Sequence, residues 1–212
     1  MPGRSHGETA LCRSVQPAGR PDLKLHLLGA SGTGTTTLGR ALAQKLGVFH
    51  ADAADYYWVP TDPPFLRKRS YKERLRLLDL DLDDDAGWVV SGSMMDWGEA
   101  VADRADHLIF LTLPTDLRIA RLRAREQQRF GARIAPGGDM YQAHENFIRW
   151  AEGYDDPSFG GRTRARHEAW LGERDGRVLR LDGAAPIAEN LARTLARVPP
   201  ILSEQKPCAS VG

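Results

Sequence analysis

Apolar positions along the chain follow two different periods. Four short segments are rich in apolar residues and predict buried strands at 23–28, 87–92, 107–113 and 177–181. A shorter apolar segment at 48–51 predicts one further strand. Between these runs, apolar residues recur every three or four positions, which predicts helices. Strands that alternate with helices indicate an α/β fold in which helices cover both faces of a five-stranded parallel sheet.

Turn and capping signals refine the predicted helices. Ser70 and Glu73 form a capping box that opens one helix, and Pro186 opens the last helix. Glycine and proline residues between 130 and 139 predict a mobile loop. The stretch 140–166 is expected to hold two helices, which are separated by a break rich in glycine.

The length of the chain fits a single domain. Of its 212 residues, 23–198 carry the alternating pattern and are expected to form one α/β domain. A lid and insertion are expected at about 126–166. The polar segments 1–22 and 199–212 are predicted to be disordered tails, because they lack apolar periodicity.

Charge and composition argue against several classes of protein. The formal net charge is +1, so no overall field attracts nucleic acid or a membrane surface. No apolar run approaches the roughly 20 residues of a membrane span, and the first 20 residues lack the apolar core of a secretory signal. Cys12 and Cys208 are too isolated to suggest a disulfide or a zinc site. We therefore expect a cytoplasmic protein that binds neither nucleic acid nor membranes.

A glycine-rich loop lies between the first predicted strand and the first predicted helix. Its sequence from Gly29 is Gly-Ala-Ser-Gly-Thr-Gly-Thr-Thr-Thr. It matches the phosphate-binding pattern G-x-x-x-x-G-K-[ST] except at the lysine position. The backbone N–H groups of such a loop cradle phosphate oxygens, and an ordinary strand–helix turn is the simpler alternative. The predicted phosphate contacts are Gly29, Ser31, Gly32, Thr33, Gly34, Thr35, Thr36 and Thr37.

Thr35 occupies the position at which the pattern places lysine. A charge-assisted hydrogen bond contributes roughly 1.5–3 kcal/mol, so its loss weakens phosphate binding roughly tenfold to a few hundredfold. The backbone N–H groups and the helix N-terminus do not depend on that side chain. Binding of a nucleotide is therefore compatible with Thr35, whereas phosphoryl transfer needs another cation.

Arginines just before the expected lid are candidates for that cation. Arg118, Arg121, Arg125 and Arg129 share one face of the predicted helix, and Arg133 follows in the loop. A solvated basic surface is the alternative for this face. Because the guanidinium group binds phosphate in a bidentate manner, Arg125, Arg129 and Arg133 are the predicted lid arginines.

A second basic group follows the insertion. It comprises Arg162, Arg164, Arg166 and His167, and its side chains are candidates for contact with an anionic substrate. An exposed helix surface is the alternative for these residues.

Two aspartates follow the second predicted strand. Asp52 is a candidate to orient the water shell of Mg²⁺ or to accept a proton from a substrate hydroxyl, and Thr36 is the candidate direct ligand of the metal. Asp55 follows Asp52 in the chain and is expected to lie nearer to the substrate. The alternative for either aspartate is a turn or a helix N-cap.

The chain resembles the P-loop small-molecule kinases of the shikimate-kinase and nucleoside-monophosphate-kinase group. The resemblance rests on the strand, loop and helix around residues 29–43 and on Leu46-Gly-Val-Phe-His-Ala-Asp52. It implies phosphate contacts from Gly32 to Thr37, Mg²⁺ on Thr36 with Asp52 behind it, and a mobile lid at 121–133. It also places the loop around Asp182 near the adenine.

Three departures from the group's pattern are visible. Thr35 replaces the lysine, Ala54 replaces the second aspartate of the shikimate kinases, and Ser91-Gly92 lacks a carboxylate at the end of the third strand. Shikimate itself is therefore not the expected substrate.

These observations support two hypotheses. The first is a kinase that uses ATP and Mg²⁺ to phosphorylate a small, anionic metabolite, as a monomer or a homodimer. The second is a nucleotide-binding regulatory protein that has lost catalysis together with the lysine. Nucleic-acid binding through the arginine-rich helix is disfavoured by the nearly neutral charge balance.

Overall fold

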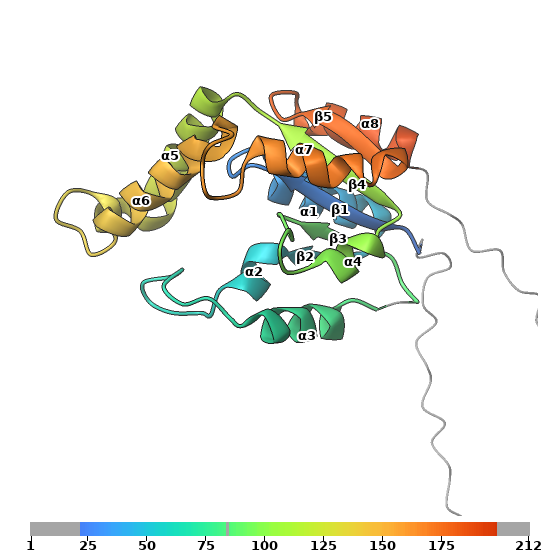
Figure 1. Ribbon diagram of the computed structural model, residues 1–212, viewed down its shortest axis with the longest axis horizontal. Coiled ribbons are helices and arrows are strands. Elements are labelled where there is room, and N and C mark those ends of the chain that lie inside the picture. Colours follow the sequence, from blue (N-terminus) through green and yellow to red (C-terminus); the bar gives the residue numbers. More distant parts are fainter. Residues whose placement is uncertain (1–21, 84, 199–212) are drawn as a thin grey trace, which may run out of the picture.

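A computed structural model describes residues 22–83 and 85–198, and its centre is a five-stranded parallel sheet (Figure 1). The strands follow the order β2-β3-β1-β4-β5 across the sheet. Their bounds are β1 Lys24–Gly29, β2 Phe49–Asp52, β3 Trp88–Ser91, β4 His107–Thr112 and β5 Val178–Asp182. All four neighbouring pairs run parallel. The α/β fold and the five parallel strands predicted from the sequence are confirmed.

Burial follows the position of each strand in the sheet. All four residues of β3 are buried, as are five of the six in β1, because helices cover both faces at the centre. The edge strands β2 and β5 each bury a single residue. The strands at the centre of the sheet thus bury most of their residues, whereas the edge strands β2 and β5, the latter from the predicted strand at 177–181, are mostly exposed or partly exposed.

Two helical layers complete the fold. One face of the sheet packs against α1 (Thr35–Leu46) and α8 (Ile187–Arg197) through a core that includes Leu25, Leu38 and Leu42. The other face packs against α3 (Tyr71–Asp81), α4 (Glu99–Asp103) and α7 (Arg164–Gly172) through a core that includes Trp88 and Phe110. The molecule therefore has the three layers expected of the fold.

Two short helices were not predicted from the sequence. They are α2 (Ala53–Tyr57) and α4, with five residues each. Neither completes two turns, so neither can show the apolar period by which longer helices are found. Both matter for the site, because α2 begins directly after β2 and α4 follows the loop after β3.

A helical hairpin stands away from the sheet (Figure 1). It consists of α5 (Thr115–Phe130) and α6 (Tyr141–Glu152), which pack through Leu122, Ile148 and Ala151. The predicted loop at 130–139 is only partly a loop, because Gly131–Ile134 forms a 3₁₀ turn. Two helices separated at Gly153–Thr163 agree with the prediction for 140–166, although the second, α7, begins only at Arg164.

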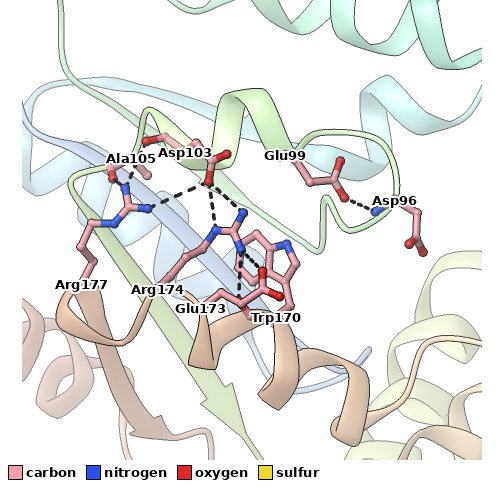
Figure 2. A network of polar contacts seen from close by, with 8 residues as sticks. All are labelled: Asp96, Glu99, Asp103, Ala105, Trp170, Glu173, Arg174 and Arg177. Carbon is pink, nitrogen blue, oxygen red and sulfur yellow. Dashed lines mark hydrogen bonds and ion pairs between the residues drawn. The ribbon is translucent and has the colours of Figure 1, made fainter.

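A polar network joins α4 to the end of α7 (Figure 2). Arg174 Nε donates to Asp103 Oδ1 at 2.9 Å, and Arg177 Nη1 donates to the carbonyl of Ala105 at 2.8 Å. In the loop that leads into α4, the N–H of Asp96 donates to Glu99 Oε1 at 2.6 Å. These contacts fix the loop after β3 against the helical layer that covers it.

None of the helices in the described part of the chain is long and apolar enough to cross a membrane. The two predicted tails, including Cys12 and Cys208, lie outside the described residues apart from Asp22.

Candidate functional site

The carboxyl ends of the strands meet at one rim of the sheet. Asp52 at the end of β2 is in register with Ser91 at the end of β3, and Ser91 is in register with Leu27 of β1. On the other side Thr112 of β4 is in register with Asp182 of β5. In open parallel sheets the ligand site lies at this rim, so the glycine loop and both candidate aspartates share one location.

The glycine loop depends on glycine for close approach and for its backbone angles. A Cβ at Gly29 would lie 2.5 Å from the carbonyl oxygen of Leu111 in β4. Gly32 has φ of +89°, and a Cβ there would lie 2.7 Å from the carbonyl oxygen of Arg118. Gly34 has φ of +102°. The loop therefore follows a path that side chains at these positions would block or strain.

The glycine loop packs against the segment that follows the last strand of the sheet. Thr33 is buried, and its hydroxyl donates to the carbonyl of Ala30 at 2.9 Å. A Cβ at Gly183, just after β5, would lie 2.7 Å from the carbonyl oxygen of Thr33. The carbonyl of Gly183 in turn accepts from Arg121 Nη1 at 2.9 Å. Arg121 is thereby engaged in fixing the turn beside the loop.

Helix α1 begins at Thr35, and its N-terminus opens towards the rim. Its N-cap is Gly34, which provides no side-chain acceptor for the first N–H groups of the helix. The first N–H groups of a helix have no partner within the helix, and they carry the positive end of its dipole. This is the arrangement that binds phosphate oxygens. Thr35 itself begins the helix and supplies no positive charge.

Thr36 and Asp52 meet across this helix start. The Thr36 hydroxyl donates to Asp52 Oδ2 at 2.9 Å, while Asp52 Oδ1 accepts from the N–H of Ala54 at 3.0 Å. Asp52 is thus the N-cap of α2, which was the structural alternative for this residue, and its second carboxylate oxygen contacts the predicted metal ligand. A hydroxyl and a carboxylate are ligand types that Mg²⁺ accepts when phosphates and water complete its shell.

No group of three or more His, Cys, Asp or Glu side chains among the described residues is arranged to hold a metal ion. Thr36 and Asp52 therefore fit a metal that is held jointly with a bound phosphate, and they do not form a complete protein cage.

His50 belongs to this cluster and was not predicted. Its Nε2 lies 3.0 Å from the Ser91 hydroxyl oxygen. Burial lowers the pKa of His50, and the nearby charge of Asp52 opposes that shift. The signal in the sequence was the period of the strand, because His50 and Asp52 are two residues apart and lie on the same side of β2.

Asp55 projects from α2 close to the same cluster. Burial raises its pKa, and the negative charge of Asp52 raises it further. The positive charges of Arg40 and Arg129 act in the opposite direction. A carboxylate with a raised pKa is a better proton acceptor than an ordinary one, which suits a role as general base.

The three predicted lid arginines differ in their surroundings. Arg125 donates to Glu126 Oε1 through Nε and Nη2, at 3.1 and 2.8 Å. Arg133 forms ion pairs with Asp62 and Asp139, both at 2.7 Å, and these raise its pKa.

Arg129 has a different environment. Its guanidinium carbon lies 5.9 Å from the centre of the Phe65 ring and 5.2 Å from that of Phe130. Among the described residues, Arg129 forms no ion pair with a carboxylate, and its charge reaches Asp55. Arg129 is therefore the lid candidate with the most available charge.

Arg118 is not part of an exposed basic face. It is fully buried between α5 and α6, where Nη2 donates to Asp155 Oδ2 at 2.9 Å and Nη1 donates to the carbonyl of Ala151 at 3.1 Å. Arg118 does lie on α5 at the predicted spacing, but the alternative of a solvated basic face is wrong for Arg118. The hairpin α5–α6 covers it, and spacing along one helix carries no information about a helix that packs later in the chain.

The residues of the second basic group also differ in their surroundings. Arg166 pairs with Asp96 at 2.9 Å, and Arg164 lies 4.0 Å from Glu168. His167 is buried, and its ring nitrogens contact the Tyr154 hydroxyl at 2.8 Å and the Ser93 hydroxyl at 3.0 Å. Burial lowers its pKa to about 3, so the ring is neutral. His167 therefore stabilises the packing of α7 and carries no charge for a substrate.

Together, the sheet order, the glycine loop after β1 and the carboxylate after β2 define a three-layer α/β protein with a P-loop-like turn at the carboxyl edge of its parallel sheet. The chain belongs to the family of the uncharacterized protein YqaC of Bacillus subtilis (strain 168). The two are 39% identical over 171 residues, which cover 81% of this chain and 94% of YqaC. No family model matches the chain.

Solved structures with a similar backbone are kinases of small molecules. A gluconokinase from Sinorhizobium meliloti 1021 covers 84% of this chain and 91% of its own, with 16% identity and a TM-score of 0.48. A sugar kinase from Janibacter sp. HTCC2649 shows 15% identity over 85% and 97% of the two chains, with a TM-score of 0.48. A shikimate kinase from Bacteroides thetaiotaomicron shows 19% identity over 82% and 97%, with a TM-score of 0.47. At these values the likeness assigns no role to any residue.

Proposed function

We propose that this protein binds ATP with Mg²⁺ and transfers the γ-phosphoryl group to the hydroxyl of a small metabolite. The observation that carries the proposal is the contact of Thr36 with Asp52 at the uncapped start of α1. It brings a hydroxyl and a carboxylate to the place where a helix N-terminus and a glycine loop favour phosphate.

The part of the site that binds the phosphates consists mainly of backbone N–H groups. The N–H groups of the loop and of the first turn of α1 bind phosphate oxygens, and the Thr36 hydroxyl and the Asp52 carboxylate would hold the metal. When bound, Mg²⁺ neutralises phosphate charge. Without the metal, Asp52 accepts a hydrogen bond from the Thr36 hydroxyl, and this bond keeps the hydroxyl oxygen and the carboxylate oxygen in place.

Asp55 and Arg129 act where the hydroxyl of the metabolite, the phosphoryl acceptor, would bind. The bond between the γ-phosphorus and the β,γ-bridging oxygen of ATP breaks and ADP leaves as the acceptor oxygen bonds to phosphorus, and Asp55 accepts the hydroxyl proton. Arg129 provides positive charge in place of the lysine that Thr35 replaces. The raised pKa of Asp55 and the absence of a carboxylate partner for Arg129 among the described residues support these roles.

The direct test is calorimetric titration with ATP and with GTP, each with and without Mg²⁺, followed by a screen of hydroxylated metabolites for ADP release. Asp52→Asn is a suitable variant, because the amide oxygen retains the cap on α2 while the charge is lost. We expect ATP to bind only weakly to Asp52→Asn in the presence of Mg²⁺, and nearly as well as to the unaltered protein in its absence. Failure of either nucleotide to bind at millimolar concentration would refute the proposal.

A second function is favoured by Thr35 alone. A nucleotide-binding regulatory protein needs the loop but not the transfer, and Thr35 removes the charge on which transfer depends most. The two functions differ in the metabolite screen. Tight binding of ATP together with no ADP release from any acceptor, and no change in either on Arg129→Ala, supports the regulatory role.

A further inference from the structure

An ion pair joins the tip of the helical hairpin to the loop between α2 and α3. Arg133 lies in the hairpin tip, residues 130–140, and its Nη1 is 2.7 Å from Asp62 Oδ1. Asp62 belongs to residues 59–69, which contain three prolines and are called the proline loop below. Both segments extend on the left in Figure 1. The described residues contain no other ion pair between the hairpin and the proline loop.

The hairpin tip holds Arg133 in the orientation that this ion pair needs. Arg133 Nε donates to Asp139 Oδ1 at 3.0 Å, and Nη2 donates to Asp139 Oδ2 at 2.7 Å. The carbonyl of Arg133 accepts from the N–H of Met140 at 2.9 Å. Because Asp139 already fixes one edge of the guanidinium plane, little side-chain freedom is lost when Nη1 pairs with Asp62.

The proline loop is in turn fixed to the helix that carries Asp55. The N–H of Val59 donates to the carbonyl of Arg67 at 2.8 Å, which closes the base of the loop. Arg69 Nη1 donates to the carbonyl of Asp55 at 2.7 Å, and the N–H of Arg69 donates to the carbonyl of Tyr57 at 2.9 Å. A contact of the hairpin with the proline loop therefore also sets the position of the hairpin relative to α2.

Phe65 provides a second contact between the same two segments. Its φ is +65°, a conformation that bulky residues rarely adopt. Such a backbone persists where surrounding contacts determine it. The Phe65 ring lies 5.9 Å from the ring of Trp58 and 5.9 Å from the guanidinium carbon of Arg129 on α5. The contact thus involves the arginine that we propose for the transfer step.

The hairpin is attached firmly at its base and weakly at its tip. Its apolar cluster of Leu122, Ile148 and Ala151 is separate from the two larger clusters that pack on the sheet. At the base, the pair of Arg118 with Asp155 includes a fully buried guanidinium group. At the tip, the Asp62 side chain is 80% exposed. Because water and salt weaken an exposed ion pair, the tip can detach while the base stays in place.

We propose that Asp62 and Arg133 form a reversible latch, which holds the hairpin tip against the proline loop and keeps Arg129 beside Phe65 on the acceptor side. Release of the latch opens the site for ligands to enter and leave. The effect on the reaction rests on the proposed function, whereas the latch itself needs no nucleotide, since both partners belong to the chain. Arg133 is then a positioning residue and does not bind phosphate.

A distance measurement on the full chain without nucleotide tests the latch. Nitroxide labels are attached at Gln128→Cys on α5 and Lys45→Cys on α1, both exposed positions, after Cys12 and Cys208 are replaced by serine. Pulsed electron spin resonance then gives the populations with the hairpin near to and far from α1. Asp62→Asn keeps the shape of the side chain and removes its charge. We expect it to change the ratio of the two populations roughly two- to fivefold, as loss of an exposed ion pair would.

Three controls separate the latch from other effects of the substitution. Asp79→Asn removes the same charge from a pair with Arg104 at 2.9 Å, which joins α3 to α4, and should leave the distances unchanged. Asp62→Glu keeps the charge and should retain most of the original distribution. About 500 mM NaCl should shift the unaltered protein towards Asp62→Asn and have little effect on that variant. A distribution for Asp62→Asn equal to that of the unaltered protein, or to that of Asp79→Asn, would overturn the proposal.

The release of ADP measures the effect of the latch on the site. A fluorescent analogue of ADP, bound with Mg²⁺, is displaced by excess ADP in a stopped-flow instrument. At low salt we expect release from Asp62→Asn to be roughly two- to fivefold faster than from the unaltered protein, with an unchanged midpoint of thermal unfolding. Equal release rates would overturn the role of the latch at the site. Failure of ADP to bind would refute only the proposed function, because the distance measurement does not depend on nucleotide.

Discussion

The phosphate side and the acceptor side of this site are built in different ways. The phosphate side consists of residues 29–37, which are consecutive and act through backbone N–H groups and one hydroxyl. The proposed acceptor side consists of Asp55 and Arg129, whose side chains come from α2 and α5. A site made of consecutive backbone depends on local conformation, whereas a site made of distant side chains depends on how charges are buried and paired.

Lowering the pH is expected to have the largest effect on stability, because it protonates buried histidines but changes no side chain of the glycine loop. Residues 29–37 contain no ionisable side chain. Where α7 packs on the sheet, burial lowers the pKa of His167 to about 3 and that of His26 to about 4, from 6.5. Both rings are neutral in the folded protein, so their contribution to stability is complete above pH 6.5 and is lost as the pH falls towards 4. Two such protons reduce the free energy of unfolding by about 5 kcal/mol over two pH units.

Urea titrations at pH 7, 6, 5 and 4 measure this loss. His167→Gln keeps a hydrogen-bonding side chain that does not titrate, so we expect about half the dependence on pH between 6.5 and 4.5 in this variant. An unchanged dependence would mean that His167 is already protonated in the folded protein, which would place a second positive charge beside Arg162.

Removal of a counter-charge is expected to have the next largest effect. Asp155→Asn leaves the fully buried Arg118 without its anion and should cost about 3 kcal/mol of stability. Asp96→Asn is the matched control, because its pair with Arg166 is exposed and should contribute less than about 1 kcal/mol. Both values come from chemical denaturation. Equal costs would show that burial does not distinguish the two pairs.

Crowding of the backbone tests the phosphate side. Gly29→Ala places a methyl group against the carbonyl of Leu111 and should cost about 1–3 kcal/mol, together with a loss of nucleotide affinity. Gly172→Ala at the end of α7 has open space around it and should be neutral or slightly stabilising. Calorimetry with ATP and Mg²⁺ and thermal unfolding measure both variants. Nucleotide binding that survives Gly29→Ala unchanged would argue against the loop as the phosphate site.

Restoration of the missing charge is expected to have the smallest effect. Thr35→Lys should tighten ATP binding about tenfold to a hundredfold, because a charge-assisted contact is added to an existing backbone site. Gln44→Lys adds the same charge at an exposed position further along α1 and should change affinity by less than about threefold. If both variants tighten binding equally, the gain reflects net charge and not the position of Thr35.

Asp52 and Arg118 show how much of the candidate site could be predicted from the sequence alone. The glycine spacing and the Thr36 and Asp52 positions were read from short local patterns, and the structure brings those two side chains together. Arg118 was grouped with Arg129 by helical spacing, but the spacing could not predict that Arg118 is buried, because its partners Asp155 and Ala151 lie more than thirty residues away along the chain. His50 was missed, although strand period places it beside Asp52.

The sequence by itself determined the parallel α/β fold and the phosphate loop, because both depend on apolar period and on neighbouring residues. It also showed that Thr35 supplies no charge. Only the tertiary structure decided which arginines have partners. It placed Arg118 with Asp155, Arg125 with Glu126 and Arg133 with Asp139. The reason is physical: whether a charge is compensated depends on groups that are distant in the chain and near in space.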